Sequence, residues 1–187
     1  FANRLIKCHE AHGRKNLPWQ RDITPYRVWL SEIMLQQTQV TTVIPYFERF
    51  LDRFPDIEEL SKSDLNEVLG LWSGLGYYAR ARNIHKTSRL IVSEFGSRFP
   101  HNLDLLMQLP GIGRSTAGAI LSISMNIPSP ILDGNVKRVL TRFHTIKGYP
   151  EQSEIKKKLW EVAGRHTPNT QFQKYTQAIM DLGATLC

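Results

Sequence analysis

The stretch that most constrains this chain is residues 109–120, which reads LPGIGRSTAGAI. Before it, apolar residues recur at the spacing of one helix face, at Leu103, Leu105, Leu106 and Leu109. Pro110 opposes continuation of that helix, and Gly111 and Gly113 let the backbone turn sharply, since either can adopt a positive φ. A second amphipathic helix follows, so the stretch predicts a helix–hairpin–helix. Its bare glycine N–H groups and helix start are suited to bind a phosphate.

A second constraint is Asp133, which lies in the segment LDGNV just before another amphipathic helix. One interpretation is purely structural, because aspartate is a favoured residue at the start of a helix. The other is chemical. A carboxyl group at a helix N-terminus is kept ionised by the helix dipole, so it is available to stabilise positive charge.

The rest of the chain indicates an all-α fold. Apolar residues recur every three or four positions, whereas strand-like alternation is scarce. Thr24 and Pro25 are typical of a helix start, and Pro45 predicts another. Besides the hairpin unit at about 103–124, we expect helices over residues 1–11, 25–40, 45–55, 60–71, 83–95, 135–144, 153–166 and 173–184.

Composition narrows the possible partners. The 187 residues are 41% hydrophobic, enough for a packed core, and 24 basic against 17 acidic residues give a net charge of +7. This charge favours an anionic partner such as nucleic acid. No segment has the length of a membrane span or the core of a signal peptide, so we expect an intracellular protein without membrane contact. Because the chain begins with Phe1 and stops at Cys187, we also expect a fragment.

The predicted helix over residues 25–40 contains Glu32, which is flanked in sequence by apolar residues. On a solvated helix face this glutamate would have no special role. If it faces inward, poor solvation should raise its pKa and keep it protonated.

Several stretches together resemble one family. LPGIGRSTAGAI followed by LDGNV is similar to the helix–hairpin–helix, Gly-Pro-Asp superfamily of DNA glycosylases, and WLSEIMLQQTQV and YTQAIMDLGATLC resemble its adenine-excising, MutY-type branch. The resemblance covers almost the whole chain. It implies a two-lobed helical fold, with a six-helix barrel over residues 23–131 that contains the hairpin. A second, iron–sulfur-type lobe would comprise residues 1–22 and 132–187, truncated before the cluster loop.

The resemblance also implies roles for individual residues. Glu32 would protonate adenine at N7 and Asp133 would stabilise the cationic sugar, after the nucleotide has been flipped out of the duplex. Residues implied to contact DNA are Gln36, Gln37, Tyr77, Arg80, Gly111, Gly113 and Ser115. Residues implied to line the base pocket are Trp19, Leu35, Asn135 and Gln177. Bifunctional members carry a lysine at the position of Ser115. Since a serine hydroxyl cannot form an imine, the resemblance implies a monofunctional glycosylase.

The implied partner is duplex DNA with adenine opposite 8-oxoguanine or guanine, bound by a monomer in the bacterial cytoplasm or nucleoid, or in the nucleus or mitochondrion of a eukaryote. Cys187 would be the first of four cysteines of a [4Fe–4S] cluster, which the full-length protein would hold and this fragment would not. Two alternatives stay open. One is an endonuclease III-type glycosylase/lyase, and the other is a helix–hairpin–helix module that binds DNA without catalysis.

Overall fold

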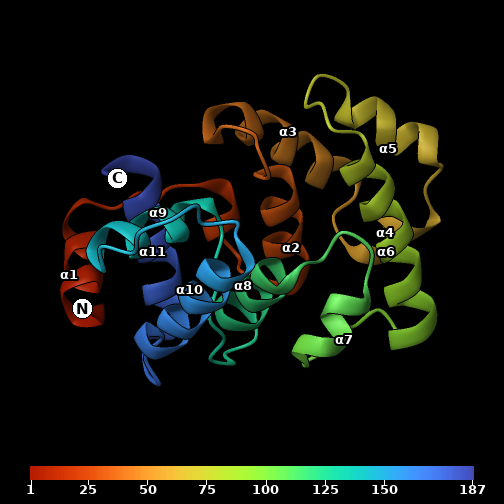
Figure 1. The fold of residues 1–187 in the computed structure, drawn as a ribbon. Coiled ribbons are helices and arrows are strands. Elements are labelled where there is room, and N and C mark those ends of the chain that lie inside the picture. The colour runs from red at the N-terminus through yellow and green to blue at the C-terminus, as the bar shows by residue number, and fades with distance from the viewer. The chain divides into compact units, whose positions relative to one another are not determined.

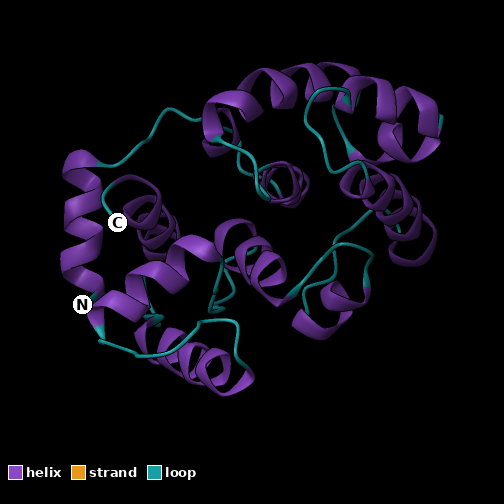
Figure 2. Ribbon diagram, turned by 45° about the horizontal axis from the view of Figure 1, so that its top comes forward, coloured by secondary structure: helices purple, strands orange, loops and turns teal.

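The structure is a computed structural model that describes residues 1–187, and it confirms the all-α prediction (Figure 1). Eleven α-helices and one short 3₁₀ helix are joined by loops, and there is no strand (Figure 2). The chain forms two compact units, one of residues 16–117 and the other of residues 1–15 with 118–187. None of the helices combines the length and the hydropathy needed to cross a membrane.

The unit of residues 16–117 is built from helices that enclose an aromatic core. Its buried rings include Trp29, Phe47, Phe50, Phe54 and Trp72. α6 packs against α2, α4 and α5, and α3 packs against α2 and α5. The elements are η1 (Pro18–Gln20), α2 (Pro25–Met34), α3 (Val40–Arg53), α4 (Ile57–Lys62), α5 (Leu65–Trp72), α6 (Ala79–Phe95), α7 (Leu103–Gln108) and the first turn of α8 (Arg114–Ser124).

Several predicted helix bounds in this unit are wrong. The helix expected over 25–40 ends at Met34, and α3 begins at Val40 with Pro45 inside it. A proline there removes one main-chain hydrogen bond, but the fully buried Val43, Phe47 and Phe50 hold the helix together. The single helix expected over 60–71 is two helices, because the Asp64 carboxylate caps a new start. α6 begins at Ala79 rather than at residue 83.

The other unit contains α1 (Ala2–His12), most of α8, α9 (Gly134–Phe143), α10 (Ser153–His166) and α11 (Phe172–Thr185). α11 packs against α1 and α9, and α9 also packs against α10. The units divide at 15/16 and 117/118, whereas the predicted boundaries lie at 22/23 and 131/132. Gly118 accounts for part of this difference, because it packs so closely on Pro130 that a Cβ there would lie 2.5 Å from the Pro130 carbonyl oxygen.

Candidate active site

Asp133 is held as the N-cap of α9. One carboxylate oxygen, Oδ1, accepts a hydrogen bond of 2.8 Å from the main-chain N–H of Val136, and Oδ2 accepts one of 3.3 Å from the side-chain amide of Asn135. Burial raises the pKa of Asp133 above its ordinary value, while the hydrogen bonds from Val136 and Asn135 oppose that rise. The helix start therefore does not lower this pKa below its ordinary value, since desolvation is the larger effect.

The start of α9 is locked against α11. A Cβ atom at Gly183 would lie 2.5 Å from the carbonyl oxygen of Asn135, so the two helices meet without an intervening side chain. Arg138 donates hydrogen bonds to the Gly183 carbonyl and, over 3.4 Å, to the side-chain oxygen of Asn135. The amide of Asn135 is thereby oriented with its NH₂ group toward Asp133. Two donors on α9 bind the carboxylate that the sequence pattern singled out, and contacts with Gly183 on α11 hold one of them, Asn135, in place.

Glu32 lies in the last turns of α2, in the unit of residues 16–117. Its side chain is half-buried, and its sequence neighbours Ser31 and Ile33 are almost fully buried. Thr24 caps the helix by accepting a hydrogen bond of 3.2 Å from the N–H of Arg27, and Pro25 occupies the first turn as predicted. Glu32 therefore does not occupy a fully solvated helix face.

The helix–hairpin–helix is formed by α7, the turn of residues 109–113 and α8. Gly111 has a φ of 80° and is exposed, and a Cβ atom there would lie 3.0 Å from the Cβ of Asn83. Gly113 is exposed too, but it has no positive φ and open space around its Cβ position. Thr87 on α6 donates a hydrogen bond of 2.9 Å to the carbonyl of Pro110, which braces the turn. The positive φ at residue 111 requires a glycine, whereas the backbone at residue 113 does not. The effect of Gly113 is instead that no side chain covers the start of α8.

Two further predicted DNA contacts lie on strained loops. Gln37, in the loop between α2 and α3, has a φ of 57°, and Tyr77, before α6, has a φ of 49°. Both residues are exposed, and the ring-bearing Tyr77 has 61% of its surface accessible. Gln36 is exposed beside Gln37. Left-handed backbone at residues other than glycine is costly and is concentrated at functional sites.

Comparisons with known proteins identify the family. Residues 30–165 match the model of the HhH-GPD superfamily base excision DNA repair protein, a span that includes Glu32, the hairpin and Asp133. The chain belongs to this superfamily. It is 52% identical, over 187 residues, to an adenine DNA glycosylase of Buchnera aphidicola subsp. Schizaphis graminum, covering 100% of this chain and 54% of that protein. It is 42% identical to the adenine DNA glycosylase of Rattus norvegicus, covering 100% of this chain and 38% of that protein.

The fold of this HhH-GPD chain also has solved counterparts. A thermostable thymine-DNA glycosylase superposes with a TM-score of 0.88 and 24% sequence identity, covering 99% of this chain and 85% of the other. This likeness concerns the helical architecture. The chain spans about half the length of the Buchnera relative and a smaller share of the rat protein.

One predicted contact of the HhH-GPD chain is corrected by the structure. Arg80 is only 7% exposed, and its guanidinium group is surrounded by protein acceptors rather than directed to solvent. These acceptors lie in the last turn of α2, in the α2–α3 loop and in the turn before α6. A side chain enclosed in this way has no free face for a phosphate.

The residues predicted to line a base pocket are divided between the units. Trp19 is half-buried in η1 and packs edge-on against Phe47, with 5.5 Å between ring centroids. Leu35 directly follows α2 and is half-buried, as is Ser115 in the first turn of α8. Asn135 lies beside Asp133 in the other unit, where Gln177 is half-buried on α11. Their common action on one base stays a prediction.

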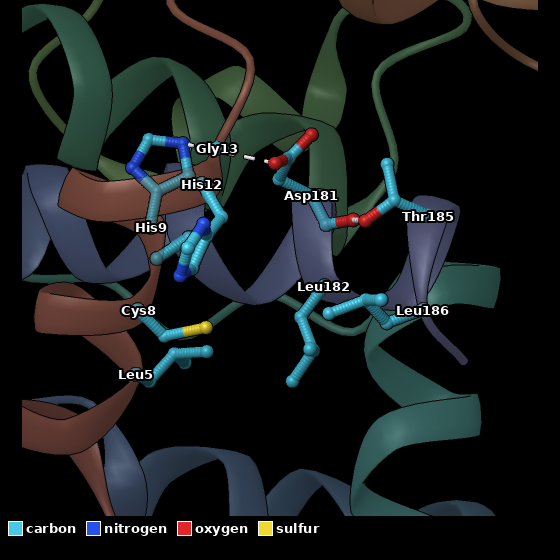
Figure 3. Close-up of a pocket in the computed structure, with 10 residues that line it drawn as sticks. Leu5, Cys8, His9, His12, Gly13, Asp181, Leu182, Thr185 and Leu186 are labelled. Carbon is cyan, nitrogen blue, oxygen red and sulfur yellow. Dashed lines mark hydrogen bonds and ion pairs between the residues drawn. The ribbon is translucent and has the colours of Figure 1, made fainter.

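A pocket between α1 and α11 is lined by the potential metal ligands Cys8, His9, His12 and Asp181 (Figure 3). They do not form a metal centre, because no three His, Cys, Asp or Glu side chains of the chain are grouped as ligands. Cys8 is exposed on α1, and Cys187 is half-buried after α11, where its carbonyl accepts a hydrogen bond from Arg142. These residues do not supply the four thiolates of an iron–sulfur cluster.

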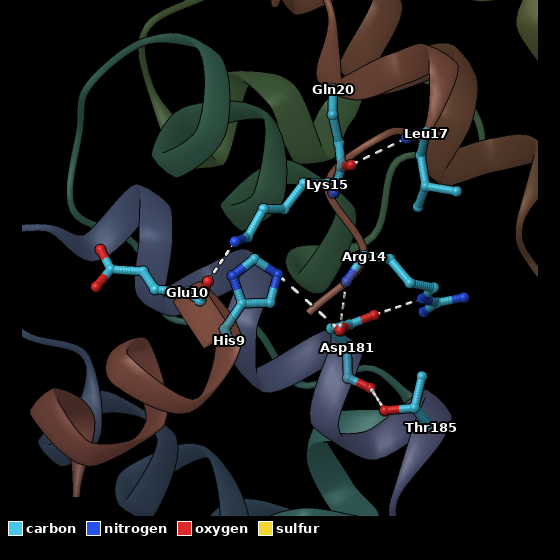
Figure 4. Close-up of polar contacts among 8 residues, drawn as sticks. All are labelled: His9, Glu10, Arg14, Lys15, Leu17, Gln20, Asp181 and Thr185. Carbon is cyan, nitrogen blue, oxygen red and sulfur yellow. Dashed lines mark hydrogen bonds and ion pairs between the residues drawn. The ribbon is translucent and has the colours of Figure 1, made fainter. Parts of the chain in front are cut away.

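Asp181 ties the segment after α1 to α11. Its carboxylate accepts hydrogen bonds from the N–H of Arg14, at 3.1 Å, and from Nε of Arg14, at 2.5 Å (Figure 4). His9 Nε2 lies 4.0 Å from the same carboxylate. Asp181 thus has a structural role in anchoring α1 to the helix that supports Asp133.

The sequence pattern missed the part played by Arg80 and Thr87 in bracing the α2–α3 loop, the turn before α6 and the hairpin turn. A signal was present, because residues 80, 84, 87 and 91 share one face of α6 and all four are buried. The arginine in that row lies on the packed face rather than on the solvated one.

Proposed function

We propose that the protein to which this chain belongs is a monofunctional DNA glycosylase that removes adenine opposite 8-oxoguanine or guanine. The observation that carries the choice of adenine is the 52% identity, over all 187 residues, to a protein named adenine DNA glycosylase. The capped, desolvated Asp133 carboxylate after the helix–hairpin–helix supports glycosidic bond chemistry.

The reaction begins with extrusion of the nucleotide, since the glycosidic bond of a stacked, paired base is inaccessible. The exposed hairpin glycines, Gly111 and Gly113, offer main-chain N–H groups to the DNA backbone. Gln37 and Tyr77 enter the base stack, because both are exposed in loops and have left-handed backbone. Insertion compensates for the stacking that the flipped base loses.

Glu32 then donates a proton to N7 of adenine, and the bond between N9 and C1′ breaks with its electron pair moving to the base. Asp133, as the carboxylate, stabilises the resulting positive charge on the sugar or bonds to it transiently. Water then adds to C1′, displacing any bond to Asp133 and losing one proton to solvent, and leaves an abasic site. This scheme needs one protonated and one ionised carboxyl group, as in two-carboxylate sugar hydrolysis.

Asn135 supports the role of Asp133 by donating to its Oδ2 atom, which favours the carboxylate form. Ser115 stands where a lyase would need a lysine amine, so no Schiff base with the sugar forms. We further propose that the protein acts as a monomer on duplex DNA. Cys187 would be the first of four cysteines of a [4Fe–4S] cluster in the longer protein, and no step of the reaction passes through that cluster.

The decisive experiment offers the full-length protein duplexes with adenine opposite 8-oxoguanine, adenine opposite guanine, and thymine glycol. Base loss and strand cleavage are scored separately under single-turnover conditions. We expect adenine loss without strand cleavage. Cleavage at thymine glycol would favour the endonuclease III-type alternative, and tight binding without any base loss would favour a plain DNA-binding module.

Two variants test the assigned carboxyl groups. Glu32→Gln should slow excision by ~10²–10⁴-fold while duplex affinity stays near that of the parent, because only proton donation is lost. Glu94→Gln, which removes an exposed carboxyl group on α6, is the matched control and should be fully active. Asp133→Asn should fold, bind DNA and be inactive. If it is folded and fully active, Asp133 is only a helix cap.

A further inference from the structure

Arg80 joins two loops that are distant in sequence. Its NH1 atom donates to the end of α2 and to the α2–α3 loop. Its NH2 atom donates to the α2–α3 loop and to the turn before α6. The acceptors of NH1 are the carbonyl oxygens of Ile33 (3.0 Å), Met34 (2.7 Å) and Gln36 (2.7 Å). Those of NH2 are Thr38 Oγ1 (3.1 Å) and the carbonyl oxygens of Leu75 (3.2 Å) and Gly76 (3.2 Å).

These acceptors bind the two terminal nitrogens of the buried guanidinium, whereas its Nε has no hydrogen-bond partner. The guanidinium is buried, and every acceptor is a main-chain carbonyl or a hydroxyl rather than a carboxylate. The carbonyls of Ile33 and Met34 belong to the C-terminal turn of α2, where the helix dipole is negative. The Trp72 ring adds a cation–π contact, with its centroid 5.4 Å from the guanidinium carbon. A buried cation held in this way fixes the backbone that surrounds it.

The backbone fixed in this way adjoins Gln37 and Tyr77, two residues with a left-handed conformation. The acceptors Gln36 and Thr38 flank Gln37, whose φ is 57°, and Leu75 and Gly76 directly precede Tyr77, whose φ is 49°. The Tyr77 ring centroid also lies 5.5 Å from the guanidinium carbon. Left-handed backbone at a residue other than glycine is strained and persists only where its surroundings hold it. One planar group therefore holds the chain beside both exposed residues.

We propose that Arg80 is a positioning residue that sets the spacing and orientation of Gln37 and Tyr77, so that both enter the DNA base stack together. The inference rests on the proposed function, because it assumes that these two side chains are inserted. Lysine cannot replace the arginine. An ammonium is a compact point charge with three donors on one atom, so it cannot serve two loops at once.

The test is a double-mutant cycle in the full-length protein with Arg80→Lys and Tyr77→Ala. Single-turnover adenine excision is measured opposite 8-oxoguanine, and 2-aminopurine beside the mismatch reports unstacking by its fluorescence. We expect Arg80→Lys to slow excision by ~10- to 100-fold, the scale of a small misplacement, and to reduce the fluorescence rise. In the Tyr77→Ala background the same change should cost much less, since its effect is transmitted partly through Tyr77. Affinity for undamaged duplex should be nearly unchanged.

Two further variants keep the test decisive. Arg89→Lys alters an exposed arginine of the same helix and should behave as the parent. Thr38→Val removes one of the six acceptors of Arg80. It should reduce excision and the fluorescence rise about threefold, which is less than Arg80→Lys does. This variant carries the test if Arg80→Lys does not fold.

The outcomes separate this inference from the proposed function. Additive effects in the cycle, or a Thr38→Val protein with the parent's excision and fluorescence, would overturn the positioning role while adenine excision by the parent stands. A parent that neither excises adenine nor unstacks the reporter would overturn the proposed function and this inference with it.

Discussion

Gly183 lies against the main chain of Asn135 so closely that a methyl group at residue 183 would be 2.5 Å from the Asn135 carbonyl oxygen and 2.7 Å from its carbonyl carbon. Both neighbours are backbone atoms, which cannot move away as a flexible side chain can. α11 therefore sets the position of the α9 start, and with it the position of the Asp133 carboxylate. This dependence can be measured.

Gly183→Ala should destabilise the protein by ~1–3 kcal/mol, because overpacking forces α9 and α11 apart. Gly164→Ala is the matched control. It lies in α10 with nothing near its Cβ position, so alanine should be neutral or stabilise by about 0.5–1 kcal/mol. Urea unfolding compares the two variants. Equal stabilities would mean that the close approach to Asn135 does not constrain the fold.

Asp133 should make stability depend on pH in a definite direction. Burial raises its pKa, so the folded chain binds the proton more tightly than the unfolded chain. The group therefore favours folding in acid, and this contribution is lost as pH rises from the ordinary pKa of about 3.9 through the raised pKa. Asp133→Asn keeps a capping side chain without the charge. It should be more stable than the parent at neutral pH, with the difference shrinking toward low pH.

Asp64→Asn is the control for that measurement. Asp64 also caps a helix, by accepting a hydrogen bond of 2.7 Å from the N–H of Asn66, but it is exposed. Without desolvation, removing its charge should give no gain in stability at neutral pH. Urea unfolding midpoints of the parent, Asp133→Asn and Asp64→Asn, measured from acid to neutral pH, check the sign of the stability difference. An Asp133→Asn variant that is less stable than the parent at neutral pH would contradict it.

Much of this architecture is predictable from local sequence, and the exceptions have physical causes. The hairpin glycines, the Thr24 cap and the position of Asp133 at a helix start are local features, and the structure has all of them. The pKa direction of Asp133 is not local, because it depends on the burial produced by packing. The position of Arg80 is not local either, since its acceptors lie up to 47 residues away.

The two hairpin glycines should respond differently to alanine. Gly111→Ala should cost about 1–2 kcal/mol of stability, because residue 111 has a φ of 80° and Asn83 crowds its Cβ position. Gly113→Ala should cost about 0.5 kcal/mol, since alanine is only a poorer residue before a helix. Its methyl group would nevertheless cover the exposed helix start, so duplex affinity should fall while the fold is kept. Thermal unfolding and fluorescence anisotropy with undamaged duplex measure the two effects separately.

A reversed result would reassign the glycines. If Gly113→Ala bound duplex as tightly as the parent, the helix start would not be the phosphate site. If Gly111→Ala were as stable as the parent, the turn would tolerate a side chain and its positive φ would not be a constraint.

Ser115 should decide whether the strand is cut. The full-length protein should leave an abasic site that breaks only after alkali or heat, and borohydride should trap almost no covalent complex, because the serine hydroxyl cannot form an imine with the sugar. Ser115→Lys places an amine in the first turn of α8, beside the hairpin. We expect it to give measurable trapping and some strand cleavage at the excised adenine. Ser93→Lys adds the same group on an exposed face of α6 and should trap nothing. Efficient trapping by the parent protein would place it among the bifunctional glycosylases, since another amine of the chain must then reach the sugar.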